Sequence, residues 1–466
     1  MTAKDLAVLP PSDPPIAVTA SARWTLFAAS FGFLMVSLDA TIVNVALPTL
    51  GDELGAGLSQ LQWVVDGYTL TFAALQLIGG ALGDRLGARR AFIGGLGLFV
   101  AASLVCGLAV CPGMLIAARF AQGLGAAVQL PASLAMIRHA YPDGAGRTRA
   151  VGVWAAAGGG AVAAGPVLGG LLLVWLGWRS LFLVNLVIGG IGLAATLRAQ
   201  GTRLGRGRRV DPPGQILVIA ALGGLVFGLI EGGTMGWGSA GVVASFVLSA
   251  VAGAGFVWWE RRAPEPILPP RLFSHRMYSC ANVAGFVQNF AYYGIVFLLS
   301  LFMQNEHGYS ALKTGLIFLP MSIAATASNI TGGRLTARWG PRIPMMAGQS
   351  LFALGLLGLL LTGPNENDWA IWAATVAAGI GGGTAVPAMS SAVLEAIEPE
   401  YAGVASAGLN TARQVGGAVG VALFGTLVAG DFLHGLRLSL LIAALALFVS
   451  SSITARWGLR GQLGTS

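Results

Sequence analysis

The stretch Gly80-Ala-Leu-Gly-Asp-Arg-Leu-Gly-Ala-Arg-Arg90 separates two long apolar runs, and a copy of it, Gly333-Arg-Leu-Thr-Ala-Arg-Trp-Gly-Pro-Arg342, follows 253 residues later. A second pair of matching stretches, Gly123-Leu-Gly125 and Gly379-Ile-Gly381, is separated by 256 residues, and a proline follows each after the same interval. Two independent pairs of matching stretches with nearly the same separation in the sequence indicate an internal repeat.

The apolar runs around these stretches are long enough to cross a membrane. The 466-residue chain is 55% hydrophobic and only 10% charged, whereas soluble domains carry about 25% charged residues. A helix needs about 20 apolar residues to span the hydrocarbon core. Fourteen runs reach this length: 24–47, 62–82, 91–110, 113–136, 149–174, 179–198, 213–231, 240–259, 278–303, 313–333, 343–362, 369–394, 402–429 and 434–455. The sequence predicts an all-α membrane protein and excludes soluble dinucleotide enzymes, nucleic-acid binders and secreted disulfide scaffolds.

The basic residues predict the orientation of the spans. If the N-terminus is cytoplasmic, 22 of the 27 Lys and Arg side chains lie in cytoplasmic segments, three lie in the opposite loops, and Arg119 and Arg413 lie within spans. This asymmetry follows the positive-inside rule. It places both termini in the cytoplasm and explains the net charge of +8 by topology, so we expect no nucleic-acid partner.

The repeat divides the fourteen predicted spans into two halves. Its matched stretches belong to spans 2 and 4 and again to spans 10 and 12, a shift of eight spans. Spans 7 and 8 are therefore extra to a six-span unit, and parallel halves are expected to face each other across a central cavity. The predicted parts are a disordered cytoplasmic tail at 1–23, a six-helix bundle at 24–198, two extra helices with basic linkers at 199–277, a second six-helix bundle at 278–456 and a cytoplasmic tail at 457–466.

Several stretches resemble the fourteen-spanning drug:proton antiporter family of the major facilitator superfamily. Span 1 carries Leu38-Asp-Ala-Thr-Ile-Val-Asn-Val-Ala-Leu-Pro48, which is similar to the family signature, and 80–90 is similar to the loop motif between spans 2 and 3. The other similar stretches are 63–68, Arg119-Phe-Ala-Gln-Gly-Leu-Gly125, Gly165-Pro-Val-Leu-Gly-Gly170 and 177–185. The resemblance covers the whole chain and is strongest to exporters of the multidrug and methylenomycin-resistance type.

The resemblance implies a major facilitator fold and a secondary transporter in the bacterial cytoplasmic membrane. Such a transporter exports hydrophobic or amphipathic drugs or antibiotics in exchange for protons, so its expected partners are protons, membrane lipid and a small lipophilic substrate. The expected state is a monomer. One alternative is a proton-linked symporter or facilitator for a small metabolite. A receptor or lipid-modifying enzyme is a more distant alternative, since the sequence has no catalytic constellation, metal-ligand cluster or nucleotide motif; we expect no enzyme activity, cofactor or metal.

Three ionisable side chains within the spans are candidates for proton coupling. Asp39 lies deep in span 1, where a carboxylate costs about 2.5–3.5 kcal/mol, so it is either a proton carrier or simply paired with a neighbour. Asp66 lies near the outer end of span 2, where we expect water to reach it; the alternative is an interfacial polar residue. For Arg119 in span 4, the resemblance implies a cation that favours proton release from a nearby acid, and the alternative is structural pairing alone.

Two glycine-containing motifs are candidates for controlling conformational change. The loop after span 2 is predicted to hold helix ends together in one state and release them in another, or to be a plain positive-inside loop. The small residues of span 5 permit close helix approach, and its proline bends the helix; the resemblance implies control of leak, and the alternative is packing. The residues are Gly80, Asp84, Arg85, Gly87, Arg89 and Arg90 in the loop, and Gly165, Pro166, Gly169 and Gly170 in span 5.

Spans 9 and 13 carry the candidate substrate-binding residues. These are Asn289, Phe290, Tyr293 and Phe297 in span 9, and Asn410, Arg413 and Gln414 in span 13. The alternatives are core packing for the aromatic stripe of span 9 and an ion pair of Arg413 with Glu395 or another acid. Because the spans contain few acids and an unpaired buried charge costs several kcal/mol, we expect neutral, anionic or monocationic lipophilic substrates.

Overall fold

The computed structural model describes residues 19–142, 144–201, 211–361, 368–398 and 400–458, and within these ranges every regular element is a helix. The elements are α1 (Ala20–Ile42), η1 (Val43–Ala46), α2 (Leu47–Leu54), α3 (Leu58–Leu86), α4 (Ala88–Gly107), α5 (Pro112–Ala140), α6 (Gly144–Leu176), α7 (Ser180–Arg198), α8 (Pro212–Met235), α9 (Ala240–Glu260), η2 (Pro270–Ser274), α10 (Arg276–Leu301), η3 (Phe302–Glu306), α11 (Ala311–Trp339), α12 (Arg342–Leu360), α13 (Asp368–Ala396), α14 (Ala402–Leu427) and α15 (Phe432–Gly458). Most of the predicted tails and of the linker after α7 lie outside the described residues. The predicted tail at 1–23 is too long, because Thr19 caps α1 by accepting a hydrogen bond from the Ala22 N–H.

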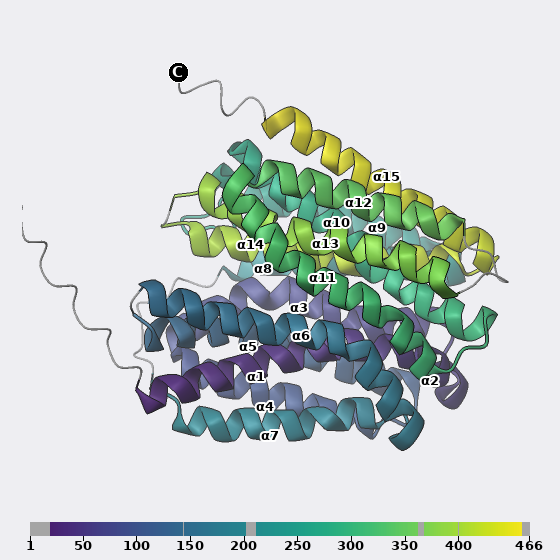
Figure 1. The fold of residues 1–466 in the computed structure, drawn as a ribbon, viewed down its shortest axis with the longest axis horizontal. Helices are drawn as coiled ribbons and strands as arrows, with labels where there is room; N and C mark the ends of the chain where they lie inside the picture. The colour runs from purple at the N-terminus through teal and green to yellow at the C-terminus, as the bar shows by residue number, and fades with distance from the viewer. Residues whose placement is uncertain (1–18, 143, 202–210, 362–367, 399, 459–466) are drawn as a thin grey trace, which may run out of the picture.

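The helices form two bundles that lie against each other (Figure 1). The first bundle contains α1 and α3 to α7, and the second contains α10 to α15. The two bundles contact each other where α3 packs on α14 and where α6 packs on α11. We call one end of the molecule the basic end, because Arg85, Arg138, Arg338 and Arg456 lie in the last turns of helices there. It lies on the left in Figure 1.

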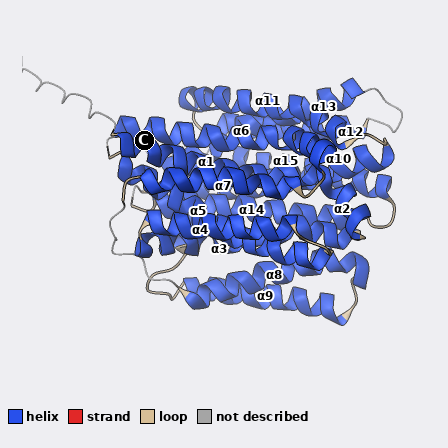
Figure 2. Ribbon diagram, turned by 90° about the horizontal axis from the view of Figure 1, so that it is seen from below, coloured by secondary structure: helices blue, strands red, loops and turns tan. Residues whose placement is uncertain are grey.

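Helices α8 and α9 form a hairpin at the edge of the two bundles (Figure 2). Near the basic end, Gln215 Nε2 on α8 donates to the Ala74 carbonyl of α3 at 2.6 Å. Near the opposite end, Thr426 Oγ1 on α14 donates to the Leu229 carbonyl of α8 at 2.6 Å. The hairpin is therefore attached through α8 to one helix of each bundle.

Thirteen helices within the described ranges are long and apolar enough to cross a membrane. They coincide with thirteen of the fourteen predicted spans. The remaining span forms α14, which is less apolar because Asn410, Arg413 and Gln414 interrupt it. Large apolar side chains such as Val187 and Val251 are 64% and 66% exposed, as expected for surfaces that face lipid.

The helix of the first predicted span is interrupted near its end, and a proline follows directly after the span. Pro48 has no N–H and cannot donate to the Asn44 carbonyl, and the chain forms the short helix η1 there. The Ser300 hydroxyl of α10 donates to this carbonyl at 2.6 Å, and Gln304 Nε2 donates to the Val45 carbonyl at 3.1 Å. These hydrogen bonds join the two bundles at the end opposite the basic end.

The sequence repeat recurs in three-dimensional contacts. Arg89 donates to the Thr196 and Leu197 carbonyls of α7 at 3.0 and 2.8 Å. Its counterpart Arg342 donates to the Ala455 carbonyl of α15. A cation near the carbonyl end of a helix is favourable. Each copy of the repeat thus connects the start of one helix to the end of the last helix in its own bundle.

Candidate functional site

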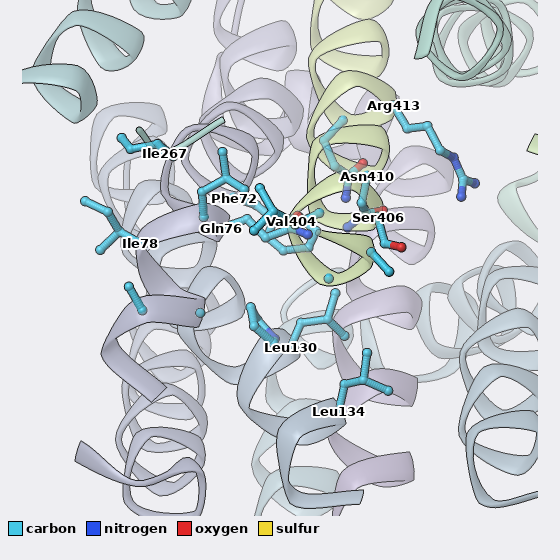
Figure 3. A pocket seen from close by; sticks show the side chains of 18 of the residues that line it. Phe72, Gln76, Ile78, Leu130, Leu134, Ile267, Val404, Ser406, Asn410 and Arg413 are labelled. Carbon is cyan, nitrogen blue, oxygen red and sulfur yellow. The ribbon is translucent and has the colours of Figure 1, made fainter. Parts of the chain in front are cut away.

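A cavity of about 1570 Å³ lies between the two bundles. Near the middle of the helices it is lined by Tyr68, Asn289, Tyr293 and Arg413, and it extends to Asp84 at the basic end. Figure 3 shows side chains of α3, α5 and α14 around part of this space. Drug-sized ligands occupy pockets of about 300–1,000 Å³, so the cavity is large enough to hold one.

A buried ion pair lies within the first bundle, beside this cavity. Arg119 of α5 pairs with Asp39 of α1, and their side chains are 1% and 0% exposed. Asp39 Oδ1 also accepts hydrogen bonds from Gln122 Nε2 at 3.2 Å and from Asn185 Nδ2 at 3.0 Å. Arg119 Nε donates to the Val64 carbonyl at 2.8 Å. Both charges are therefore satisfied by a hydrogen-bond network that involves α1, α3, α5 and α7.

Tyr68 separates the ion pair from the cavity. Its ring centroid lies 4.5 Å from the guanidinium carbon of Arg119, and its hydroxyl donates to the Val36 carbonyl at 3.0 Å. Because Tyr68 also lines the cavity, it links the two regions. Sequence reasoning assigned no role to Tyr68 or Asn185, although both lie in stretches that resemble the family. Spacing along separate helices does not reveal that Tyr68 contacts Arg119 and that Asn185 contacts Asp39.

Asp66 is more deeply buried than predicted. Its side chain is 0% exposed, and neither carboxylate oxygen has a hydrogen-bond partner among the described residues. One turn earlier on α3, Gln62 Nε2 donates to the Val421 and Ala422 carbonyls of α14 at 3.2 and 2.7 Å. The expectation that water reaches Asp66 is therefore wrong in this conformation, because α14 covers the same face of α3.

The predicted loop motif lies at the basic end of the cavity. Gly80 and Asp84 line the cavity, and Arg85 and Arg90 are exposed. Gly87 joins α3 to α4 with φ +84°, a conformation that favours glycine. Among the described residues, no basic group lies within ion-pair distance of Asp84. Arg89 of this loop holds the end of α7, but the ionic latch, by which we mean the predicted pairing of Asp84 with basic groups at helix ends, is not formed in this conformation.

The glycines of the predicted span-5 motif lie against α1. A Cβ atom on Gly165 would lie 2.0 Å from Thr41 Oγ1, and a Cβ on Gly169 would lie 2.6 Å from Val45 Cγ2. Larger residues at these two positions would collide with the helix that carries Asp39. The motif therefore permits the close approach of α6 to α1.

The same motif also contacts the second bundle. A Cβ on Gly170 would lie 2.7 Å from Leu312 Cα, and a Cβ on Gly315 would lie 2.3 Å from the Pro166 carbonyl oxygen. Helices α6 and α11 therefore touch backbone to backbone at the end opposite the basic end. None of these four residues lines the cavity.

Most predicted substrate-binding residues face the cavity, but two do not. The lining residues are Asn289, Tyr293, Asn410, Arg413 and Gln414. The prediction is wrong in this conformation for Phe290 and Phe297, which lie in the hydrophobic core with 6% and 0% exposure. The Phe290 ring packs at 4.7 Å from the ring of Phe424 on α14. The close packing of α10 on α14 therefore directs these rings away from the cavity.

Comparisons with known proteins agree with this architecture. The family model of the Major Facilitator Superfamily matches residues 29–421. The chain is 38% identical over 421 residues to the methylenomycin A resistance protein of Streptomyces coelicolor, covering 90% of this chain and 89% of that protein. It is 37% identical to the multidrug resistance protein Stp of Mycobacterium tuberculosis, covering 87% and 75% of the two chains.

A solved structure has a similar fold. The crystal structure of a bacterial homologue of the human lysosomal transporter Spinster, in an inward-facing and unoccupied conformation, superposes with a TM-score of 0.67. The match covers 95% of this chain and 98% of that chain at 15% sequence identity. At this identity the likeness concerns the fold alone.

Proposed function

The chain belongs to the major facilitator superfamily, and from that premise we propose that it exports drugs or antibiotics across the cytoplasmic membrane in exchange for protons. Relatives that match most of the chain are named for drug and antibiotic resistance. The observation that carries the proposal is the buried Asp39–Arg119 pair, whose Arg119 contacts Tyr68 in the wall of a drug-sized cavity. Ionisable groups inside a membrane domain are costly and mark substrate or proton pathways.

In the proposed orientation the basic end faces the cytoplasm, in keeping with the positive-inside rule. Both termini are then cytoplasmic, and the cavity is accessible from the cytoplasm while α6 and α11 close the other side. The two bundles form the moving halves, and α8 and α9 are the two additional helices of a six, two and six arrangement. The protein acts as a monomer surrounded by lipid in the inner membrane.

Export follows from rocking of the two bundles around the cavity. The substrate enters from the cytoplasm, the contact between α6 and α11 opens, and the basic end closes. Asp84 then lies near basic groups of the opposing helix ends, which is the state in which the predicted latch forms. Gly165 and Gly169 keep α6 against α1 during this movement, so the proton site moves as part of one body.

Asp39 and Asp66 carry protons in this scheme. Burying an unpartnered carboxylate in its charged form is costly, so Asp66 holds a proton in the conformation described here. In the same conformation Asp39 is paired with Arg119. Outward opening separates α3 from α14 and moves Arg119 away from Asp39, so both carboxylates take up protons from the outside. The Asp39 proton is released when the pair with Arg119 forms again, and the Asp66 proton is released when substrate binds from the cytoplasm.

The test combines resistance with transport. The full-length protein is expressed in an efflux-deficient bacterium, and susceptibility to a panel of lipophilic antibiotics is measured. Inverted membrane vesicles with an acidic lumen are then tested for accumulation of the compounds that the protein protects against. We expect accumulation in the vesicles that stops when a protonophore collapses the gradient. Accumulation that needs no gradient, or that requires the opposite one, would instead indicate a facilitator or a symporter.

A further inference from the structure

Arg413 is a cation in the wall of the cavity without an acidic partner. Its half-buried side chain extends from the middle of α14, and its aliphatic stem lies on Gly285 of α10, where a Cβ would be 2.8 Å from Arg413 Cγ. The side-chain group hydrogen-bonded to it is the Asn289 amide, with 3.5 Å between Arg413 Nε and Asn289 Oδ1. Among the described residues, no carboxylate lies within ion-pair distance of this guanidinium.

The acids that could have balanced Arg413 are engaged elsewhere or lie outside the cavity. Asp39 pairs with Arg119, and Asp66 is not part of the cavity wall. Glu231 of α8 accepts hydrogen bonds from Ser59 and Trp63 at 2.8 Å each. Glu395, the partner considered from the sequence, is exposed and does not pair with Arg413.

The charges that line the cavity differ between its two ends. Acids and bases are mixed at the basic end, where Asp84, Asp211, Glu260, Glu265 and Glu400 occur together with Arg138, Arg261 and Arg271. Near the middle of the helices, Arg413 contributes the single formal charge among the described lining residues. The lining of the deep part of the cavity therefore carries one positive formal charge.

The surroundings of Arg413 combine polar groups with an apolar wall. Asn410 and Gln414 lie on the same helix, and Asn289 and Tyr293 belong to α10. Figure 3 shows Ser406, Asn410 and Arg413 along α14, with Leu130 and Leu134 of α5 on another wall of the same space. Pockets of this kind place a few polar groups against apolar walls that hold most of the ligand.

We propose that Arg413 binds an acidic group, such as a carboxylate, on the exported compound, while the apolar walls hold its lipophilic body. A guanidinium donates two parallel hydrogen bonds to a carboxylate, which gives both strength and orientation. Binding of an anion also removes the cost of a cation that is partly desolvated and unpaired. The inference rests on the proposed export function and narrows its substrates to lipophilic acids.

The test compares three probes that share a pyrene body and carry head groups of different charge: pyrenebutyrate, its neutral N-methylamide and the analogous trimethylammonium compound. Their binding to the purified full-length protein is measured by scintillation proximity. We expect the wild type to bind the carboxylate about ten-fold or more tightly than the amide, and the ammonium compound more weakly still. Arg413→Gln removes the preference because it weakens binding of the carboxylate probe alone. Arg413→Lys keeps part of the preference, because an ammonium group is charged but cannot donate two parallel hydrogen bonds as a guanidinium does.

Arg437→Gln serves as the matched control, because Arg437 is an exposed residue of the same bundle outside the cavity; its binding profile should equal that of the wild type. Equal binding of the three probes by the wild type, or no binding of pyrenebutyrate, would overturn the inference even if Arg413→Gln does not fold. An equal loss of affinity for all three probes in a folded Arg413→Gln protein would also overturn the inference. Proton-driven export of neutral drugs without a carboxylate preference would leave the proposed function intact, whereas failure to export every compound of the panel would overturn that function itself.

Discussion

Asp39 on α1 and Arg119 on α5 form an ion pair that is almost completely excluded from solvent, although 80 residues separate them in the sequence. Gln122 and Asn185 complete the set of donors to the carboxylate. Removing one partner of a buried pair leaves an uncompensated charge and costs about 3–5 kcal/mol. Stability and proton coupling can therefore be separated at this site by choosing which charges are removed.

Asp39→Asn should abolish proton-coupled export and also destabilise the protein by several kcal/mol, since Arg119 is left without its counter-ion. The double variant Asp39→Asn/Arg119→Gln has no unpaired charge, so it should recover most of the stability but none of the coupling. Thermal unfolding in detergent and substrate-induced proton release measure the two properties. Proton release by Asp39→Asn equal to that of the wild type would remove Asp39 from the coupling mechanism.

Asp66→Asn should behave differently from Asp39→Asn. Because Asp66 has no hydrogen-bond partner among the described residues, the uncharged amide replaces a protonated acid of the same shape, and unfolding should be almost unchanged. The variant should nevertheless release fewer protons per substrate bound, which a pH-indicator dye in weakly buffered detergent solution detects. A large loss of stability would show that Asp66 has a charged partner in the ground state.

Tyr68 should prevent proton leak between the cavity and the ion pair. Tyr68→Phe keeps the ring over Arg119 and loses only the hydroxyl that bonds to Val36, so coupling should persist. Tyr68→Leu loses a cation–π contact worth about 0.5–2 kcal/mol and opens space beside the charges. We expect a substrate-independent proton flux in Tyr68→Leu proteoliposomes and little flux with Tyr68→Phe. Identical flux in both variants would contradict the assigned role.

Gly170→Val should favour the outward-open state. The added Cβ would lie 2.7 Å from the Cα atom of Leu312, so the contact between α6 and α11 cannot close. Gly190→Val is the matched control, because a Cβ on Gly190 of α7 has nothing within 4 Å. In a Cys111→Ser background, the introduced thiol of Gln304→Cys should react several-fold faster with a membrane-impermeant maleimide in Gly170→Val cells than in Gly190→Val cells. Equal rates in the two glycine variants would show that this contact does not control outward opening.

The helical membrane character of this protein is determined by its sequence alone, for local reasons. A run of about 20 apolar residues satisfies its backbone only as a helix in lipid, so composition was enough to predict the spans. Thirteen of them meet the same criterion in the structure, and α14 falls short only because it carries polar residues. The repeat was also visible in the sequence, and Arg89 and Arg342 make equivalent contacts because the two copies fold alike.

The partners of the candidate functional side chains were decided by the tertiary structure. The sequence left Asp39 as either a proton carrier or a carboxylate simply paired with a neighbour, because helix periodicity fixes which face a residue occupies but not which helix lies opposite. Asp66 is buried because α14 covers its face of α3, and Phe290 packs on Phe424 for the same kind of reason. Arg413 was predicted to bind either a substrate or an acid, and only the positions of the other helices show that the described acids lie beyond its reach.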